Sequence, residues 1–243
     1  MNYNVFVELI YLAFLTLIAA TIGTMTGFGT STIMVPILSL FLPIPVTLLF
    51  VGILHWFGDI WKMMFFKKGL SCKLILLFGI PGITLSFFAA RLPLALSEEL
   101  LGRLLGMFLV AYVAFLFFKP EWKIKPSNLS AVSGGALSGF FSGIFGVGGA
   151  IRSTFLTAFD LDKSVFLFTS GVIGFLIDSS RIAQYFMSGI QIGPLVTALI
   201  LCIPVSLLGA YIAKRLVDKI PQKSFRLFIT IALFLVGLRH LLL

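Results

Sequence analysis

The chain has 243 residues, of which 59% are hydrophobic, and its mean hydropathy is +1.12. Its 18 basic and 9 acidic residues are too few to cover the surface of a soluble protein of this size. The apolar stretches approach the roughly 17–25 residues of a bilayer-crossing helix, and they lack the two-residue alternation of a transmembrane barrel. The composition therefore predicts an all-α polytopic membrane protein that lies in a lipid bilayer.

Ten helical segments are predicted, five in each half of the chain. Their ranges are 5–25, 30–42, 45–66, 72–91 and 98–118 in the first half, and 129–145, 149–160, 164–187, 192–214 and 222–242 in the second. Residues 1–243 form one transporter domain, with a first repeat over 1–119, a linker over 120–127 and a second repeat over 128–243. The second segment of each half has roughly 12–13 residues, so we expect it to be broken or re-entrant.

The same landmarks occur in both halves. At an offset of 119 positions, Gly27-Phe28-Gly29 returns as Gly146-Val147-Gly148, Asp59 as Asp178 and Lys62 as Arg181. At an offset of 123, Pro81 returns as Pro204, Arg91 as Lys214 and Arg103 as Arg226. Glycine breaks and ionisable residues that recur in two apolar halves are typical of internally duplicated membrane transporters.

Three basic loops set the expected topology. Residues 67–73, 119–127 and 214–223 hold clustered lysines and arginines, so the positive-inside rule places them in the cytoplasm and both termini outside. Between the second and third of these loops the chain must cross the membrane an even number of times. The short glycine-rich segment and the segment before it therefore either both cross or form a re-entrant hairpin. The halves then have opposite orientations in the cytoplasmic membrane, which makes them an inverted repeat.

The glycine motifs are the candidate substrate site. Glycine turns at the start of a helix expose backbone N–H groups that favour an anion, and neighbouring hydroxyls add hydrogen-bond donors. Arg152 follows the second motif by one helical turn, and its guanidinium could hold an oxyanion through two hydrogen bonds. The alternative is that these glycines only permit close helix packing. The candidate residues are Thr26, Gly27, Phe28, Gly29, Thr30, Ser31, Gly146, Gly148, Gly149, Arg152 and Ser153.

Ionisable residues inside the apolar segments form a second candidate group. Asp59 with Lys62, and Asp178 with Arg181, are three residues apart, so each pair shares one helix face. These pairs either serve ion coupling or are structural ion pairs that fix the helices, because intramembrane charges usually face a partner or a wet cavity. His55 lies four residues before Asp59, and either titrates there or packs through a hydrogen bond. Gln184 could line the same cavity.

The glycine motifs also carry a family resemblance. Residues 27–38, which read Gly-Phe-Gly-Thr-Ser-Thr-Ile-Met-Val-Pro-Ile-Leu, and residues 146–152, which read Gly-Val-Gly-Gly-Ala-Ile-Arg, resemble the two glycine-rich motifs of the TauE/SafE family. The resemblance extends over nearly the whole chain. It implies a permease that moves sulfite, sulfonates or related organosulfur anions across the cytoplasmic membrane.

The predicted function is therefore secondary transport of a small anion by alternating access, without nucleic-acid binding. A passive anion channel and a cation-coupled transporter of another small carboxylate are the alternatives, with H⁺ or Na⁺ as candidate coupling ions. Enzyme motifs such as His-Glu-x-x-His and Gly-x-Ser-x-Gly are missing, and no metal site or cofactor is expected. The sequence does not define the oligomeric state.

Overall fold

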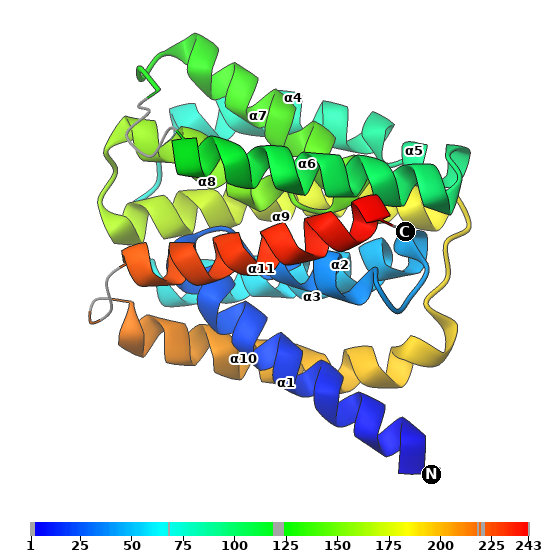
Figure 1. Cartoon of the computed structure of the whole chain (residues 1–243). Coiled ribbons are helices and arrows are strands. Elements are labelled where there is room, and N and C mark those ends of the chain that lie inside the picture. Colours follow the sequence, from blue (N-terminus) through cyan, green and yellow to red (C-terminus); the bar gives the residue numbers. More distant parts are fainter. Residues whose placement is uncertain (1–2, 68, 119–123, 218, 220–221, 243) are drawn as a thin grey trace.

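The computed structural model describes residues 3–67, 69–118, 124–217, 219 and 222–242, and this part of the chain is built from helices (Figure 1). The first half contains α1 (Tyr3–Thr26), α2 (Ser31–Leu38), α3 (Ile44–Phe65), α4 (Cys72–Ala89), α5 (Leu92–Ala95) and α6 (Glu98–Phe118). The second half contains α7 (Asn128–Phe145), α8 (Gly148–Leu156), α9 (Lys163–Met187), α10 (Val196–Leu216) and α11 (Gln222–Leu242). The predicted all-α polytopic fold is confirmed.

The predicted segments differ from the helices in two places. The second segment was expected to run to residue 42, but α2 ends at Leu38 and the chain continues in turns. The sequence prediction missed the four-residue helix α5, which begins just after Arg91 with a proline in its first turn. Residues 119–123, which include the end of the predicted first repeat and half of the linker, lie outside the described residues.

Five helices in the described part are long and apolar enough to cross a membrane: Glu8–Thr26, Ile44–Phe65, Cys72–Ala95, Lys163–Met187 and Val196–Leu216. In contrast, α2 has 8 residues and α8 has 9. At about 1.5 Å per residue, neither can cross the roughly 30 Å hydrocarbon core. Each short helix packs on the long helix before it, and its length favours the re-entrant hairpin, which stays a prediction.

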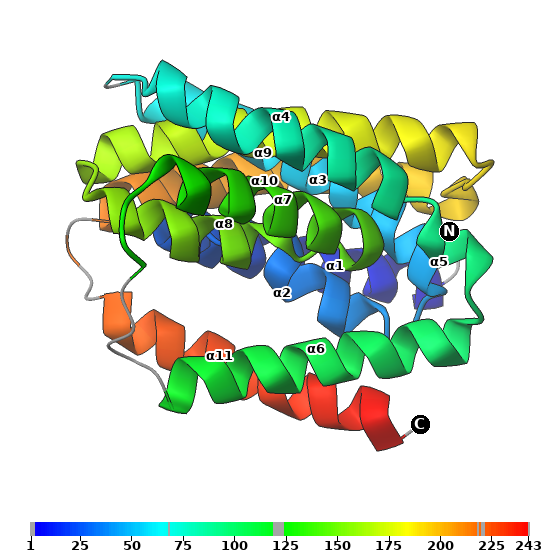
Figure 2. The ribbon, with the colours of Figure 1, turned by 90° about the horizontal axis from the view of Figure 1, so that it is seen from above.

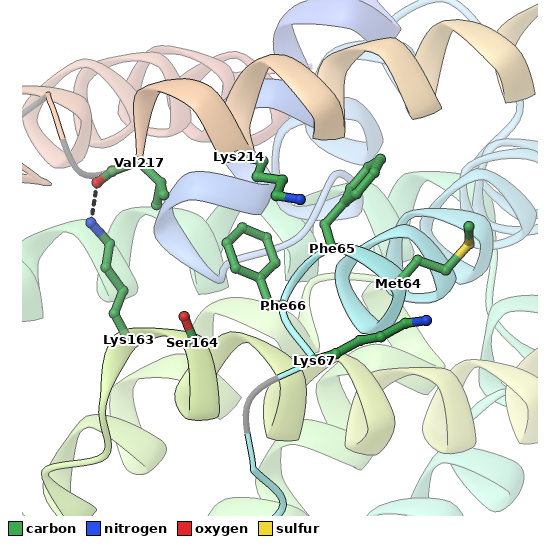
Figure 3. A pocket seen from close by; sticks show the side chains of 8 residues that line it. All are labelled: Met64, Phe65, Phe66, Lys67, Lys163, Ser164, Lys214 and Val217. Atoms are coloured by element: carbon green, nitrogen blue, oxygen red, sulfur yellow. Dashed lines mark hydrogen bonds between the residues drawn. The ribbon is translucent and has the colours of Figure 1, made fainter.

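The helix ends sort into two groups (Figures 1 and 2). The ends of α3, α6 and α10 and the starts of α4, α7 and α11, which border the three basic loops, lie together at one end of the molecule. The start of α1 and the end of α11 lie at the opposite end. The α1–α2 and α7–α8 hairpins therefore enter from opposite ends. Figure 3 shows a cavity at the basic end, lined in part by Lys67, Lys163 and Lys214.

Glycines on α7 set the closest helix contact. A Cβ on Gly135 would lie 2.3 Å from the carbonyl oxygen of Phe78, and one on Gly139 would lie 2.1 Å from that of Gly82. Without a Cβ at these positions, the backbones of α4 and α7 approach directly, as small residues allow in membranes. The four-residue spacing of these glycines places them on one face of α7, and the residues they contact on α4 have the same spacing.

The helix pairs show a regular pattern between the halves. By their place in each half, α4 corresponds to α10, α7 to α1 and α9 to α3. Helix α4 packs on α7 and α9, and α10 correspondingly packs on α1 and α3. The remaining large pairs, α3 with α9 and α6 with α11, each join corresponding helices. Figure 2 shows the α6–α11 pair along one flank. This pattern supports the inverted repeat, which stays a prediction.

Candidate functional site

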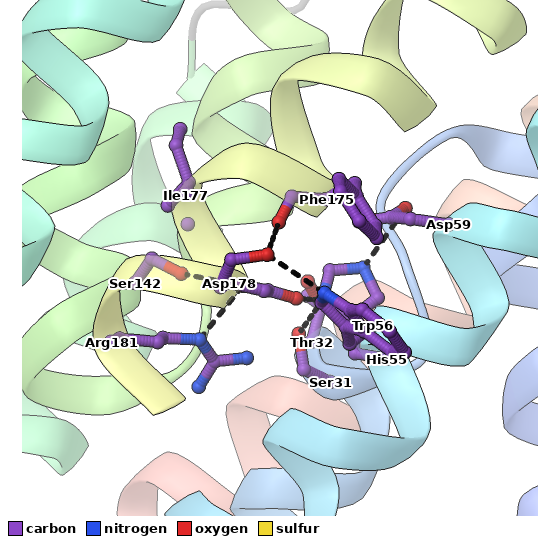
Figure 4. Close-up of polar contacts among 12 residues, drawn as sticks. Ser31, Thr32, His55, Trp56, Asp59, Ser142, Phe175, Ile177, Asp178 and Arg181 are labelled. Carbon is purple, nitrogen blue, oxygen red and sulfur yellow. Dashed lines mark hydrogen bonds and ion pairs between the residues drawn. The ribbon is translucent and has the colours of Figure 1, made fainter. Parts of the chain in front are cut away.

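The centre of the molecule holds a buried ionic cluster between α3 and α9 (Figure 4). Helix α3 supplies His55, Asp59 and Lys62, and helix α9 supplies Asp178 and Arg181. On each helix the spacing of three or four residues places these side chains on one face, and the two faces pack against each other. Each of these side chains is no more than 1% exposed, so the cluster is closed to solvent.

Asp178 is the more fully bonded of the two carboxylates. Its Oδ1 accepts hydrogen bonds from Arg181 Nε at 2.7 Å and from Ser142 Oγ at 3.3 Å. Its Oδ2 lies 2.8 Å from His55 Nδ1. Three groups from α3, α7 and α9 therefore converge on one carboxylate. Such charge-assisted hydrogen bonds are shorter and about twice as strong as neutral ones.

Asp59 has fewer partners. Its Oδ1 accepts a hydrogen bond from Lys62 Nζ and lies 3.7 Å from His55 Nε2. Its Oδ2 is buried and makes no hydrogen bond with the described residues. Asp178 Oδ2 likewise makes no hydrogen bond with the described residues, so the two carboxylates differ at Oδ1, which has two donors in Asp178 and one in Asp59.

His55 connects the two halves. Its Nδ1 lies 3.1 Å from Ser31 Oγ and 2.8 Å from Asp178 Oδ2. Its Nε2 faces Gly29, which has a φ of +82°, and a Cβ at Gly29 would lie 2.0 Å from this nitrogen. His55 thus contacts Ser31 through a hydrogen bond, and its role in titration or in packing stays a prediction. The structure adds that it lies between both aspartates.

Arg152 reaches the same cluster from α8. Its Nε donates to Ser170 Oγ at 3.1 Å, while its Nη2 is buried and makes no hydrogen bond with the described residues. A Cβ on Gly174 would lie 2.6 Å from Arg152 Nη2 and 2.2 Å from Asp59 Oδ2. Gly174 occupies the position in the second half that His55 holds in the first. Because Gly174 has no side chain, the ends of the Arg152 and Asp59 side chains both lie against its Cα.

The two glycine-rich turns meet beside this cluster. Ser153 Oγ donates to the carbonyl of Gly27 at 2.6 Å, and a Cβ on Gly149 would lie 2.0 Å from the carbonyl oxygen of Phe28. Gly27 and Gly146 have φ values of +76° and +69°, which L-residues with side chains rarely adopt. The tips of the hairpins are therefore in direct contact.

Several predicted hydroxyl donors already have partners. Thr26 Oγ1 donates to the carbonyl of Ile22 at 2.9 Å, and Ser31 contacts His55. No side-chain hydrogen bond caps α2 at Thr30. Buried guanidinium nitrogens of Arg152 and Arg181, by contrast, make no hydrogen bond with the described residues. The role of the glycine-rich segments in binding, including that of Gly148, stays a prediction.

Gln184 does not join the ionic cluster. Its side chain contacts Arg91 Nε at 3.4 Å and Ser188 Oγ at 2.9 Å, near the end of α9. Conversely, the sequence interpretation missed Ser142, Ser170 and Gly174. Ser170 and Gly174 lie eight and four residues before Asp178 on α9, so helical periodicity from Asp178 could have identified both.

The cluster also has the spacing of a possible cation site. One ligand atom from each of His55, Asp59 and Asp178 lies within 4.8 Å of the others. However, Lys62 already binds an oxygen of Asp59, and Arg181 binds an oxygen of Asp178. A metal ion would therefore have to compete with two resident cations. This donor set does not fit a structural metal centre.

Comparison with known proteins agrees with this architecture. The profile of the family described as sulfite exporter TauE/SafE matches residues 12–240, nearly the whole chain. No match was found among curated proteins or among solved structures. The match includes both glycine-rich turns, all six buried ionisable residues of the central cluster and the five candidate spans apart from the first residues of α1. The chain therefore belongs to the sulfite exporter TauE/SafE family of membrane transporters.

Proposed function

We propose that the protein is a secondary permease that moves a small anion, sulfite, an organosulfonate or a related sulfur oxyanion, by alternating access. The family supports an exporter-type permease for sulfur anions. The chain contains no Walker motif, so the energy comes from an ion gradient, the membrane potential or the substrate gradient itself. The substrate binds where the α1–α2 and α7–α8 turns meet.

The charge balance of the buried cluster carries this proposal. Three bases, Lys62, Arg152 and Arg181, are buried beside two acids, Asp59 and Asp178, each at no more than 1% exposure. With His55 neutral, the formal charge of the cluster is one positive. An uncompensated charge inside a membrane protein is costly. A bound anion would neutralise the excess and gain from the low dielectric around it.

Unused hydrogen-bond donors accompany the excess charge. Arg181 Nη1 and Nη2 and Arg152 Nη2 are buried without hydrogen bonds to the described residues. Both guanidinium groups approach the turn between α7 and α8: a Cβ on Gly146 would lie 3.3 Å from Arg181 Nη1, and one on Gly149 would lie 3.7 Å from Arg152 Nη2. Planar guanidinium donors suit the oxygens of a sulfite or sulfonate group.

The site is shielded from both ends, which fits an occluded state of a carrier. The hairpins enter from opposite ends, and their tips touch at Phe28 and Gly149. Movement of one hairpin away from the other would open the site to one side at a time. The regular pairing of helices between the halves supports such a rocking motion around a fixed central site.

Binding of sulfite to the purified protein tests the proposal. Sulfite should raise the melting temperature of the wild type, because a ligand that binds only the folded state stabilises it. Arg152→Gln should reduce this stabilisation while the protein stays folded. Arg103→Gln is the matched control, since Arg103 is an exposed arginine paired with Glu99. Equal sulfite affinity in the wild type and in folded Arg152→Gln would refute the role of Arg152.

Cation coupling is a second candidate function, favoured by the position of His55 between the two carboxylates. If Asp178 takes part in proton or sodium coupling, Asp178→Asn should transport its anion without the pH or sodium dependence of the wild type. Transport by Asp178→Asn that keeps the wild-type dependence would exclude this role. Counterflow into preloaded liposomes separates a carrier from a channel, because only a carrier shows saturable acceleration by internal substrate.

A further inference from the structure

A cavity opens at the basic end of the molecule, apart from the buried cluster (Figure 3). It has a volume of about 470 Å³, within the roughly 300–1,000 Å³ range of small-molecule sites. Three lysines line it: Lys67 after the end of α3, Lys163 at the start of α9 and Lys214 near the end of α10. Lysines from three separate parts of the chain thus line one cavity, which we call the lysine vestibule.

The vestibule has a defined positive character. No aspartate or glutamate is among its described lining residues, although Asp162 lies next to Lys163 at the start of α9. Lys214 Nζ lies 5.3 Å from the centre of the Phe65 ring, a cation–π contact, and Lys163 Nζ donates to the carbonyl of Val217. These contacts hold Lys163 and Lys214 at the cavity wall.

The opposite end of the molecule has the reverse character. A cavity of about 400 Å³ there is lined by Glu98, Glu99 and His240, among others. The two cavities have comparable size but opposite acidic and basic composition. Clefts with one sign of charge raise the local concentration of the opposite ion, so the vestibule favours an anion.

Apolar residues lie between the vestibule and the proposed substrate site. Phe66 lines the vestibule and packs in a buried cluster with Met25 and Phe166. A Cβ on Gly27 would lie 2.6 Å from the Phe166 ring, and the carbonyl of Gly27 accepts the hydrogen bond from Ser153. Ser153 is the neighbour of Arg152 in α8. These residues connect the wall of the vestibule with the segment of α8 that carries Arg152.

We propose that the lysine vestibule is an outer oxyanion-binding site that captures the transported anion before it passes the Phe66–Phe166 layer. This inference rests on the proposed anion transport. Lysine ammonium groups are hydrated point charges on flexible stems, so they favour fast and reversible capture, whereas the buried arginines favour defined hydrogen bonds. The vestibule thus differs in function from the central site: it supplies the anion and does not fix its orientation.

The test is sulfite transport in proteoliposomes of neutral phosphatidylcholine, with sulfite supplied on the side of the basic loops. The test variant carries Lys67→Gln, Lys163→Gln and Lys214→Gln. The matched control carries Lys73→Gln, Lys125→Gln and Lys219→Gln, which removes three exposed lysines that do not line the vestibule. Should the test variant fail to fold, the double variant at Lys67 and Lys214 replaces it, because both residues are exposed.

We expect the test variant to raise the KM for sulfite roughly tenfold with kcat unchanged, and to lose the wild-type dependence of KM on ionic strength. Its equilibrium affinity for sulfite, measured by thermal shift, should equal that of the wild type. The same KM and salt dependence in the test and control variants would overturn the vestibule proposal. If these variants still transport sulfite, the proposed central site is not affected by that result. A wild type that neither binds nor transports sulfite would instead refute the proposed function.

Phospholipid headgroups share the oxyanion chemistry and provide a second arm. Added phosphatidylglycerol should not change the wild-type KM if the vestibule serves the transported anion. If phosphatidylglycerol raises the wild-type KM and the lysine substitutions abolish that rise, the vestibule is a lipid-phosphate site and the capture proposal is wrong.

Discussion

Gly174→Ala tests whether the shared space beside Asp59 and Arg152 is needed for anion binding. A Cβ at this position would lie 2.2 Å from Asp59 Oδ2 and 2.6 Å from Arg152 Nη2, while ordinary contact begins at 3.4 Å. Both contacted atoms are the far ends of side chains, so they can move and the helix can remain intact. The expected result is a folded protein in which the Arg152 guanidinium is displaced.

The magnitude follows from the contact that would be lost. A hydrogen bond to a charged group contributes about 1.5–3 kcal/mol, and each 1.4 kcal/mol corresponds to about a tenfold change in affinity. Displacement of Arg152 Nη2 should therefore weaken sulfite binding roughly 10- to 100-fold. Opposing this, alanine is favoured over glycine inside a helix by about 1 kcal/mol, which limits any loss of stability.

Gly79→Ala is the matched control. Gly79 also lies inside a long helix, and the nearest atom to its added Cβ would be Leu176 Cδ1 at 3.8 Å, an ordinary contact. Sulfite affinity should stay at the wild-type value in this variant. The assay is thermal shift over a range of sulfite concentrations, which gives affinity and stability together. Wild-type affinity in a folded Gly174→Ala protein would refute the assignment of Arg152 to the anion site.

Three further predictions concern stability and topology. Tyr185→Phe removes the buried hydrogen bond to the carbonyl of Gly143 and should lower stability by about 1–3 kcal/mol, measured by unfolding in detergent; an unchanged unfolding curve would contradict this. Gly139→Ala places a Cβ 2.1 Å from the Gly82 carbonyl and should destabilise the α4–α7 pair by about 1–3 kcal/mol, whereas unchanged stability would show that α7 moves without cost. The exposed Cys72 should react with a membrane-impermeant thiol reagent only from the cytoplasmic side, and labelling from outside would reverse the predicted topology.

The elements that could be predicted were those with strong local signals. Long apolar stretches located the spans to within a few residues, since length and hydropathy alone decide whether a helix can cross a membrane. The glycine breaks predicted where the backbone turns, and Gly27, Gly29 and Gly146 do have positive φ values. Helix α5 was missed because four residues give no periodic signal.

Predictions about the site were weaker because they depend on contacts between distant segments. The spacing of Asp59 with Lys62, and of Asp178 with Arg181, predicted the two ion pairs, because three residues along a helix bring side chains together. Nothing local indicated that His55 would contact Asp178, 123 positions away in the sequence. The partners of Arg152 were likewise hidden, since Ser170 belongs to another helix.

The sequence by itself determined the class of protein and the identity of the charged residues that must be buried, and it predicted the two-part layout. These depend on composition, helical periodicity and an offset along the chain. Only the tertiary structure decided which charges lie together. That decision requires the packing of α3 against α9 and the contact between opposed hairpin tips, because only these bring three bases and two acids into one enclosed volume.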